Sequence, residues 1–167
     1  MELLDVALLV LRVVAGATMF AHGAQKAFGW WGGPGPAGWT GFIGKMGFRP
    51  APLFSALSIG AELSGAVLLL GFLTPLVAAL LVGHVIVIIG KAHFKNGFWN
   101  ANQGYEFALS LLAAVVAVLL AGPGVISVDG LIGFSLAPDV RLVLLAIGLA
   151  GGFGTLALQR LVAPAPS

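Results

Sequence analysis

The segment LFSALSIGAELSGAVLLLGFLTPLVAALLVGHVIVIIGK, residues 53–91, decides the fold class. It consists of two apolar runs joined by a Thr-Pro pair, and before its final lysine it contains only two ionisable side chains, Glu62 and His84. A helix needs roughly 20 mostly apolar residues to cross about 30 Å of hydrocarbon, and proline suits the first turn of a new helix. The segment therefore predicts two consecutive transmembrane helices, over residues 53–73 and 75–91.

Three further apolar stretches outside this segment also have the length of a membrane helix, and they cover residues 3–24, 105–121 and 140–162. Together, the first four helices predict an all-α fold, a polytopic membrane four-helix bundle. The last stretch predicts a fifth, C-terminal transmembrane helix. A length of 167 residues favours a single membrane domain, residues 1–167.

The connection over residues 25–52 has an unusual composition, with eight Gly, four Pro and three Trp. A flexible linker would favour serine and charged residues. Tryptophan is enriched where membrane meets water, so we expect this loop to lie at the interface and to include a short surface helix over residues 36–47.

The overall composition supports a membrane location. Hydrophobic residues make up 59% of the chain and charged residues 8%, with a mean hydropathy of +1.07, whereas a soluble domain carries about 25% charged residues. Eight scattered basic residues do not form a nucleic-acid-binding surface. The absence of cysteine excludes thiol–disulfide chemistry and thiolate-bound iron–sulfur clusters. Because Glu2 and Asp5 stand where a signal peptide would be basic, we expect the first helix to be retained.

The distribution of basic residues predicts the orientation, because cytoplasmic loops are enriched in Lys and Arg. With five spans, one side of the membrane collects Lys26, Lys45, Arg49, Lys91, Lys95 and Arg160. The opposite side has Arg141 together with Glu2, Asp5, Asp129 and Asp139. The basic loops are therefore predicted to be cytoplasmic, with the N-terminus outside.

Three ionisable residues, Arg12, Glu62 and His84, fall near the centres of three different predicted helices. Charged groups at mid-membrane cost about 2.5 kcal/mol or more, so they usually have a partner or a function. The simplest arrangement is an intramembrane polar layer with an Arg12–Glu62 ion pair and a hydrogen bond from His84 to the same carboxylate. The layer could be a functional site or a polar contact that only fixes helix register, and the two interpretations are compatible.

A second group of polar residues is expected nearer the cytoplasmic side. His22 and Lys26 are four residues apart on one helical face, and Glu106 begins the fourth helix at similar depth. Gly23 would let a backbone or a ligand approach closely. We predict that His22, Lys26 and Glu106 border an apolar cleft that binds a polar head group. Lys91, His93 and Lys95 are instead typical of interfacial residues at helix ends.

A haem or metal site is disfavoured by the positions of the histidines. His22 and His84 differ in depth by roughly ten residues along their helices, and no helix carries the Glu-x-x-His pattern of carboxylate metal sites. No metal ligands are therefore predicted.

Three motifs resemble the DoxX family of small membrane proteins. They are LRVVAGATMFAHGAQK (residues 11–26), ELSGAVLLLG (residues 62–71) and GPGVISVD (residues 122–129). The chain departs from the family where Thr74-Pro75 replaces a frequent Thr-Arg, and where the fifth helix extends the usual four-helix core. The resemblance implies a four-helix bundle in a bacterial inner membrane, an association with quinone or redox partners, and a site built from Arg12, His22, Lys26 and Glu62.

The leading functional hypothesis is therefore an integral membrane subunit of a DoxX-type redox complex. It would dock a membrane or redox partner protein, or a second copy of itself, and could bind quinone, with His22 donating a proton and Lys26 stabilising negative charge. Because no recognisable flavin, haem or cluster motif is present, it would not be a complete enzyme alone. The alternatives are a structural or assembly subunit without chemistry, and a small-solute or proton-coupled transporter, which a discontinuous helix would support.

Overall fold

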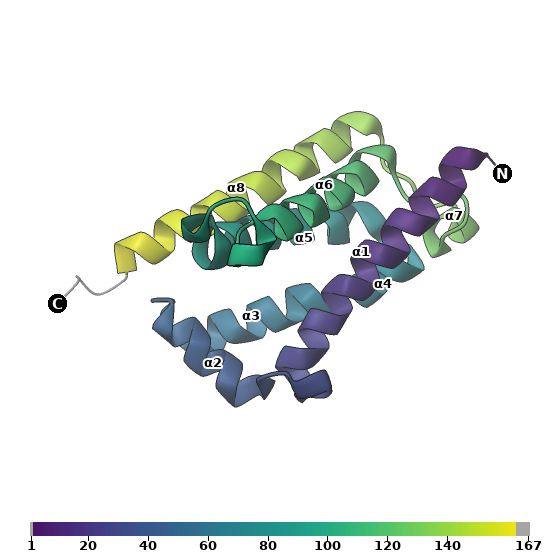
Figure 1. The fold of residues 1–167 in the computed structure, drawn as a ribbon. Helices are drawn as coiled ribbons and strands as arrows, with labels where there is room; N and C mark the ends of the chain where they lie inside the picture. Colours follow the sequence, from purple (N-terminus) through teal and green to yellow (C-terminus); the bar gives the residue numbers. More distant parts are fainter. Residues whose placement is uncertain (1, 163–167) are drawn as a thin grey trace.

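The structure of the chain is a computed structural model that describes residues 2–162 (Figure 1). Every regular element in that range is helical, which confirms the predicted all-α fold. The α-helices are α1 (Leu3–Phe28), α2 (Gly35–Lys45), α3 (Ala51–Leu63), α4 (Gly65–Leu70), α5 (Thr74–Ile88), α6 (Glu106–Ala121), α7 (Val128–Ile132) and α8 (Pro138–Val162). A π-helical turn, Ile89–His93, continues α5, and 3-10 turns occupy Trp30–Gly32, Phe94–Asn96 and Asn100–Asn102.

Four helical segments of the described chain are long and apolar enough to cross a membrane. They are Leu3–Phe28, Ala51–Leu70, Thr74–Asn96 and Pro138–Leu161, so the predicted C-terminal membrane helix is confirmed by length and composition. The helix predicted over residues 105–121 is present as α6, but it has only 16 residues. At 1.5 Å per residue it is about 24 Å long, shorter than the hydrocarbon core of a typical bilayer.

The second span is formed by α3 and α4, which meet at Ser64. The backbone there stays in the right-handed helical region, with φ −62° and ψ −10°. The Ser64 amide still donates to the carbonyl of Gly60, and the Leu68 amide donates to the carbonyl of Ser64. The regular helical ladder is nevertheless interrupted at Ser64, and the span consists of two helices joined end to end at a bend.

The segment over residues 25–52, predicted as an interfacial loop, is largely helical. α1 continues to Phe28 and ends at Gly29, whose left-handed φ of 70° suits glycine. The predicted surface helix over residues 36–47 is found as α2. It folds back against α1 and α3, so this segment forms part of the bundle.

α5 occupies the centre of the bundle and contacts α3, α4, α6 and α8 (Figure 1). It is apolar on all its faces, which is typical of a helix surrounded by others. Leu81, Val82 and Val85 are fully buried in the core. The central position of α5 brings His84 inside the protein, close to α3.

Glycines let two pairs of helices cross closely. A Cβ on Gly65 of α4 would lie 2.4 Å from the carbonyl oxygen of Gly16 in α1, and one on Gly83 of α5 would lie 2.8 Å from the carbonyl oxygen of Gly148 in α8. Small residues at such crossings allow backbone-to-backbone packing between membrane helices.

The Gly16–Gly65 crossing leads to a testable prediction for stability. Gly65→Ala should lower the free energy of unfolding by about 1–3 kcal/mol, because the methyl group would force α1 and α4 apart. Gly60→Ala is the matched control, since a Cβ there meets no atom within 4 Å. Unfolding by SDS in mixed micelles would measure both variants, and equal effects at the two positions would contradict the close crossing.

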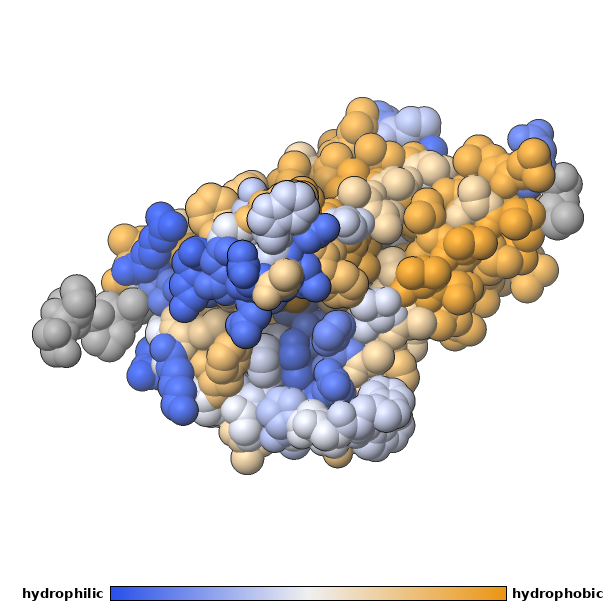
Figure 2. Space-filling view, viewed as in Figure 1, coloured by the Kyte–Doolittle hydropathy of each residue, from blue (hydrophilic) through white to orange (hydrophobic). Residues whose placement is uncertain are grey.

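The surface is divided between an apolar and a polar end. Figure 2 shows hydrophobic residues over the N-terminal part of α1 and near α7, whereas hydrophilic residues gather around α2 and the segment between α5 and α6. Contacts join the ends of α2, α5 and α8, because Gln159 binds Lys91 and the carbonyl of Met46. Several basic residues predicted to share one side of the membrane therefore lie at the same end of the molecule.

Candidate functional site

Glu62 of α3 is the centre of a buried ionic cluster. Its side chain is 1% exposed, and its Oε1 forms an ion pair with Lys26 Nζ of α1. The same oxygen lies 3.1 Å from His84 Nε2 of α5. Lys26 and His84 are 13% and 11% exposed, so both keep part of their surface open. The predicted hydrogen bond between His84 and the Glu62 carboxylate is confirmed.

Gly23 allows this cluster to form. A Cβ on Gly23 would lie 2.8 Å from the Leu63 amide nitrogen and 3.0 Å from Glu62 Cβ, so only glycine lets α1 approach α3 this closely. Lys26 follows Gly23 by three residues and therefore shares its helical face. The close backbone approach expected at Gly23 is confirmed, and it places the ammonium group of Lys26 on Glu62.

α2 supplies a further member of the cluster, Trp39. The Lys26 ammonium lies 3.9 Å from the centre of the Trp39 ring, within the range of a cation–π interaction. Sequence reasoning missed this role, because Trp39 appeared to be one of several interfacial tryptophans. The position of Trp39 depends on α2 folding back over α1, which no local pattern predicts.

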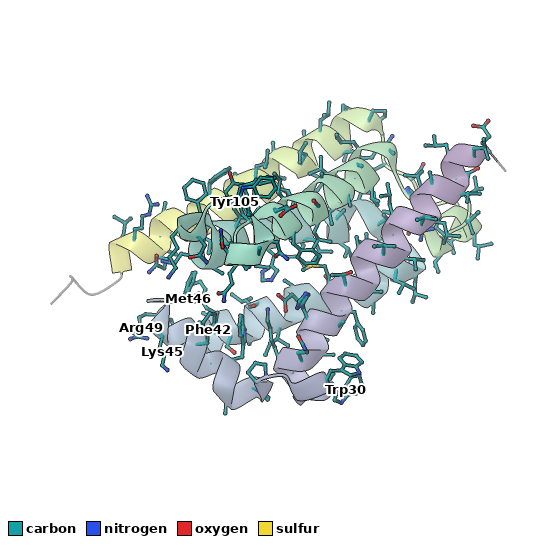
Figure 3. All side chains as sticks on the ribbon, viewed as in Figure 1. Trp30, Phe42, Lys45, Met46, Arg49 and Tyr105 are labelled. Carbon is teal, nitrogen blue, oxygen red and sulfur yellow. The ribbon has the colours of Figure 1, made fainter. Side chains whose placement is uncertain are left out.

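A cavity of about 840 Å³ adjoins the cluster and is lined by residues of α1, α2, α3, α5, α6 and α8. Apolar side chains form most of its lining, including Phe42 of α2 and Met46, which follows α2 (Figure 3). The polar wall contains Lys26, Glu62 and His84. Figure 2 shows the surface hollowed between α2 and the segment that joins α5 to α6.

The residues of the predicted head-group site are only partly brought together. His22 lines the cavity beside Lys26 and is exposed, with its ring 6.4 Å from that of Phe107. Glu106 lies outside the cavity lining, and its Oε2 accepts a hydrogen bond from the amide of Asn100, 2.9 Å away. Glu106 therefore stabilises the turn before α6.

The predicted Arg12–Glu62 ion pair is wrong. Among the residues that the structure describes, the partners of Glu62 are Lys26 and His84. The second span runs antiparallel to α1, with Glu62 opposite Gly23 and Gly65 opposite Gly16. Arg12 precedes Gly23 by eleven residues, which corresponds to about 16 Å along a helix. The sequence placed all three ionisable residues at one depth because it ended the first helix too early and could not include the offset between helices.

Arg12 belongs to a second polar cluster, at the opposite end of the bundle. Its guanidinium donates to the carbonyls of Leu69, 3.3 Å away, and Ile126. Asp129 of α7 is fully buried and attracts Arg12. Its two carboxylate oxygens each accept a 2.8 Å hydrogen bond, from the amides of Leu73 and Thr74 at the start of α5.

This second cluster caps a helix. The first amides of a helix have no intrahelical partner, and a side chain from a distant part of the chain supplies one here. Sequence reasoning counted Asp129 only as an acidic residue of the outer side and as part of a motif. The sequence does contain a signal. The residue before Thr74-Pro75 is Leu73, whose side chain cannot accept a hydrogen bond, so the first amides of α5 need an acceptor from elsewhere in the chain.

Comparison with known proteins is consistent with this geometry. The family model of DoxX matches residues 7–94, which include most of α1, all of α2 to α5 and all the residues of the Glu62 cluster. The chain belongs to the DoxX family. No curated protein and no solved structure matches it. In this DoxX protein α6, α7 and α8 follow the matched segment, and α8 adds a membrane helix that also lines the cavity.

Proposed function

We propose that this DoxX protein is the quinone-binding membrane subunit of a redox complex, in which a partner protein exchanges electrons with a quinone held in the cavity. The observation that carries the proposal is an apolar cavity of about 840 Å³ with one polar wall. Small-molecule sites typically enclose 300–1,000 Å³ and combine an apolar lining with a few well-placed polar groups. A quinone has the matching shape, a polar ring on an apolar tail.

The charge around Glu62 favours a neutral ligand there, whereas Lys91, which lines another part of the cavity, is hydrogen-bonded to Gln159. Lys26 carries a positive charge and Glu62 a negative one, and their ion pair leaves the cluster close to neutral when His84 is uncharged. Introducing a charged ligand into such an apolar site would be unfavourable unless the ligand brought its own counter-charge. A quinone ring is uncharged, and its two carbonyl oxygens accept hydrogen bonds.

The donors needed by those carbonyls are available at the wall. The Lys26 ammonium has three N–H donors, of which one engages Glu62. The imidazole of His22 lines the same cavity and makes no hydrogen bond with another described residue. Lys26 and His22 would therefore donate to the quinone oxygens, while Glu62 and His84 hold Lys26 in place.

The same residues could deliver protons. Reduction of a quinone to a quinol consumes two electrons, which the partner protein would supply, and two protons, which must reach the ring oxygens. The imidazole of His22 has two ring nitrogens that can each carry a proton, so His22 could pass protons to a quinone oxygen. Lys26 would offset negative charge as it develops on the ring oxygen.

The break between α3 and α4 at Ser64 is the feature of the second span that bears on the transporter alternative. Transporters of this kind use discontinuous helices whose free backbone groups bind substrate or ions. Here the hydrogen bonds between Gly60, Ser64 and Leu68 continue through the bend. These bonds hold α3 and α4 end to end, and the cavity rather than this break carries the proposed function.

Quinone binding can be tested through Trp39, which lies beside the polar wall. A variant with Trp30→Phe, Trp31→Phe and Trp99→Phe keeps Trp39 as its only tryptophan, and the three replaced side chains are exposed. In nanodiscs, a short-chain quinone should quench Trp39 saturably. His22→Ala should raise the Kd roughly 2- to 10-fold, the effect of losing one hydrogen bond.

Thr18→Ala is the control for this measurement, because Thr18 lies on the same helix but outside the cavity. It should leave the Kd unchanged. Quenching that rises linearly with quinone content, or an equal Kd for the His22 and Thr18 variants, would show that quinone only partitions into the bilayer.

A further inference from the structure

A group of basic residues surrounds Gln159 at the polar end of the molecule. Gln159 is buried, and its side chain accepts a 2.7 Å hydrogen bond from Lys91 and donates a 3.2 Å bond to the carbonyl of Met46. These bonds tie together the end of α2, the turn after α5 and the last turn of α8. Lys45 and Arg49 are exposed on either side of Met46 in the chain (Figure 3), and Arg160, next to Gln159, is exposed as well.

These cations lack counter-charges within the protein. None of Lys45, Arg49, Lys91 and Arg160 forms an ion pair with a carboxylate among the residues that the structure describes. Arg160 lies close enough to Lys91 to repel it. Arg49 donates only to the backbone carbonyls of Gly44 and Phe48. The group therefore has unbalanced positive charge on a rigid frame.

The group lies near the ends of three candidate spans, where lipid head groups are expected. Arg49 lies just before the second span, Lys91 near the end of the third, and Arg160 near the end of the fourth. Exposed tryptophans, which favour the interface between membrane and water, lie at Trp30 and Trp31 between α1 and α2. Apolar surface for acyl chains adjoins the group, since Met46, Phe48 and Lys91 also line the cavity.

We propose that Lys45, Arg49, Lys91 and Arg160 form a binding site for the phosphate of an anionic phospholipid. The phosphodiester supplies the counter-charge that the protein lacks. Its negative charge offsets the repulsion between Lys91 and Arg160. Arginine pairs well with phosphate because its guanidinium donates two parallel hydrogen bonds. The bound lipid joins the ends of α2, α5 and α8 at the edge of the cavity. This inference does not depend on quinone binding.

Native mass spectrometry of the full chain tests the site. The protein is incubated in detergent with equal amounts of phosphatidylglycerol and phosphatidylcholine that have the same acyl chains. Phosphatidylglycerol should be retained preferentially. Arg49→Gln and Arg160→Gln should each lower the preference about fivefold, because a basic residue near an anionic surface contributes on the order of a tenfold factor or less. Millimolar inorganic phosphate should not displace the lipid, which distinguishes a lipid site from a free-phosphate site.

Lys95→Gln is the matched control, because Lys95 is exposed at the same end but makes no contact with the Gln159 group. It should retain the preference. An equal loss in all three variants would show attraction by net charge alone, and no preference in the unmodified protein would also overturn the proposal. The melting temperature in phosphatidylcholine micelles should be the same for all variants, since the altered side chains are exposed. Quinone quenching of Trp39 is measured in the same variants. It should be unchanged, because Arg49, Arg160 and Lys95 do not line the cavity, so a failure of one proposal can be told from a failure of the other.

Discussion

Glu62→Leu is expected to destabilise the protein by about 3–5 kcal/mol, the effect of removing one partner from a buried ion pair. The substitution leaves the Lys26 ammonium largely buried between α1 and α3 without a carboxylate. It also removes the hydrogen-bond partner of His84. SDS-induced unfolding in mixed micelles would measure the loss. Glu106→Leu is the control, and it should cost no more than about 1 kcal/mol because Glu106 binds one amide at the surface.

A double variant separates a structural role of this cluster from a functional one. Lys26→Met combined with Glu62→Leu removes both charges and replaces them with apolar side chains of similar size. Such replacements of buried ion pairs are often neutral or stabilising, so most of the lost stability should return. The quinone affinity of the double variant should be about 10- to 100-fold below that of the unmodified protein, because the charged hydrogen-bond donor Lys26 is gone.

Each outcome of the double variant favours one of the two roles. Recovery of stability without recovery of quinone affinity supports a binding site. Recovery of both would mean that the ion pair only fixes the packing of α1 on α3, as in the assembly-subunit hypothesis. Glu106→Leu should leave quinone affinity unchanged, since Glu106 lies outside the cavity lining.

Asp129→Ala is expected to lower the free energy of unfolding by about 2–5 kcal/mol. Two amides at the start of α5, those of Leu73 and Thr74, lose their hydrogen-bond acceptors, and each unsatisfied buried donor costs about 1–3 kcal/mol. Arg12 also loses the nearby negative charge that offsets its burial. The melting temperature in detergent and the yield of folded protein would report the change.

Two further variants test the cause of this effect. Asp129→Asn keeps one acceptor oxygen, so it should recover about half of the lost stability. Asp139→Ala removes an exposed aspartate in the first turn of α8 and should change stability by less than about 1 kcal/mol. If the two alanine variants behaved alike, Asp129 would not act by capping α5.

The helices themselves were predictable from local patterns. The apolar runs, the Thr-Pro start of α5 and the Gly-Pro-Gly end of α6 mark where helices begin and end, because hydrophobic length and backbone preferences depend on neighbouring residues. The C-terminal helix α8 and the short helix α2 were found in the same way. The errors concern where helices end, since α1 continues past residue 24 and the helix predicted over residues 53–73 is divided at Ser64.

The residues of the candidate site were also recognisable by type, because ionisable side chains are rare inside apolar runs and stand out there. Their partners were not. Glu62 contacts Lys26 rather than Arg12 because the Gly16–Gly65 and Gly23–Glu62 crossings set the offset between α1 and the second span. Trp39 and Asp129 reach their positions only when α2 and α7 fold back on the bundle.

The apolar sequence thus specifies a bundle of membrane helices by itself, since the transfer of each apolar run into lipid depends on that run alone. The choice between Arg12 and Lys26 as the partner of Glu62 belongs to the tertiary structure. It depends on the distances between atoms of different helices, and these distances follow from which glycines allow two backbones to meet.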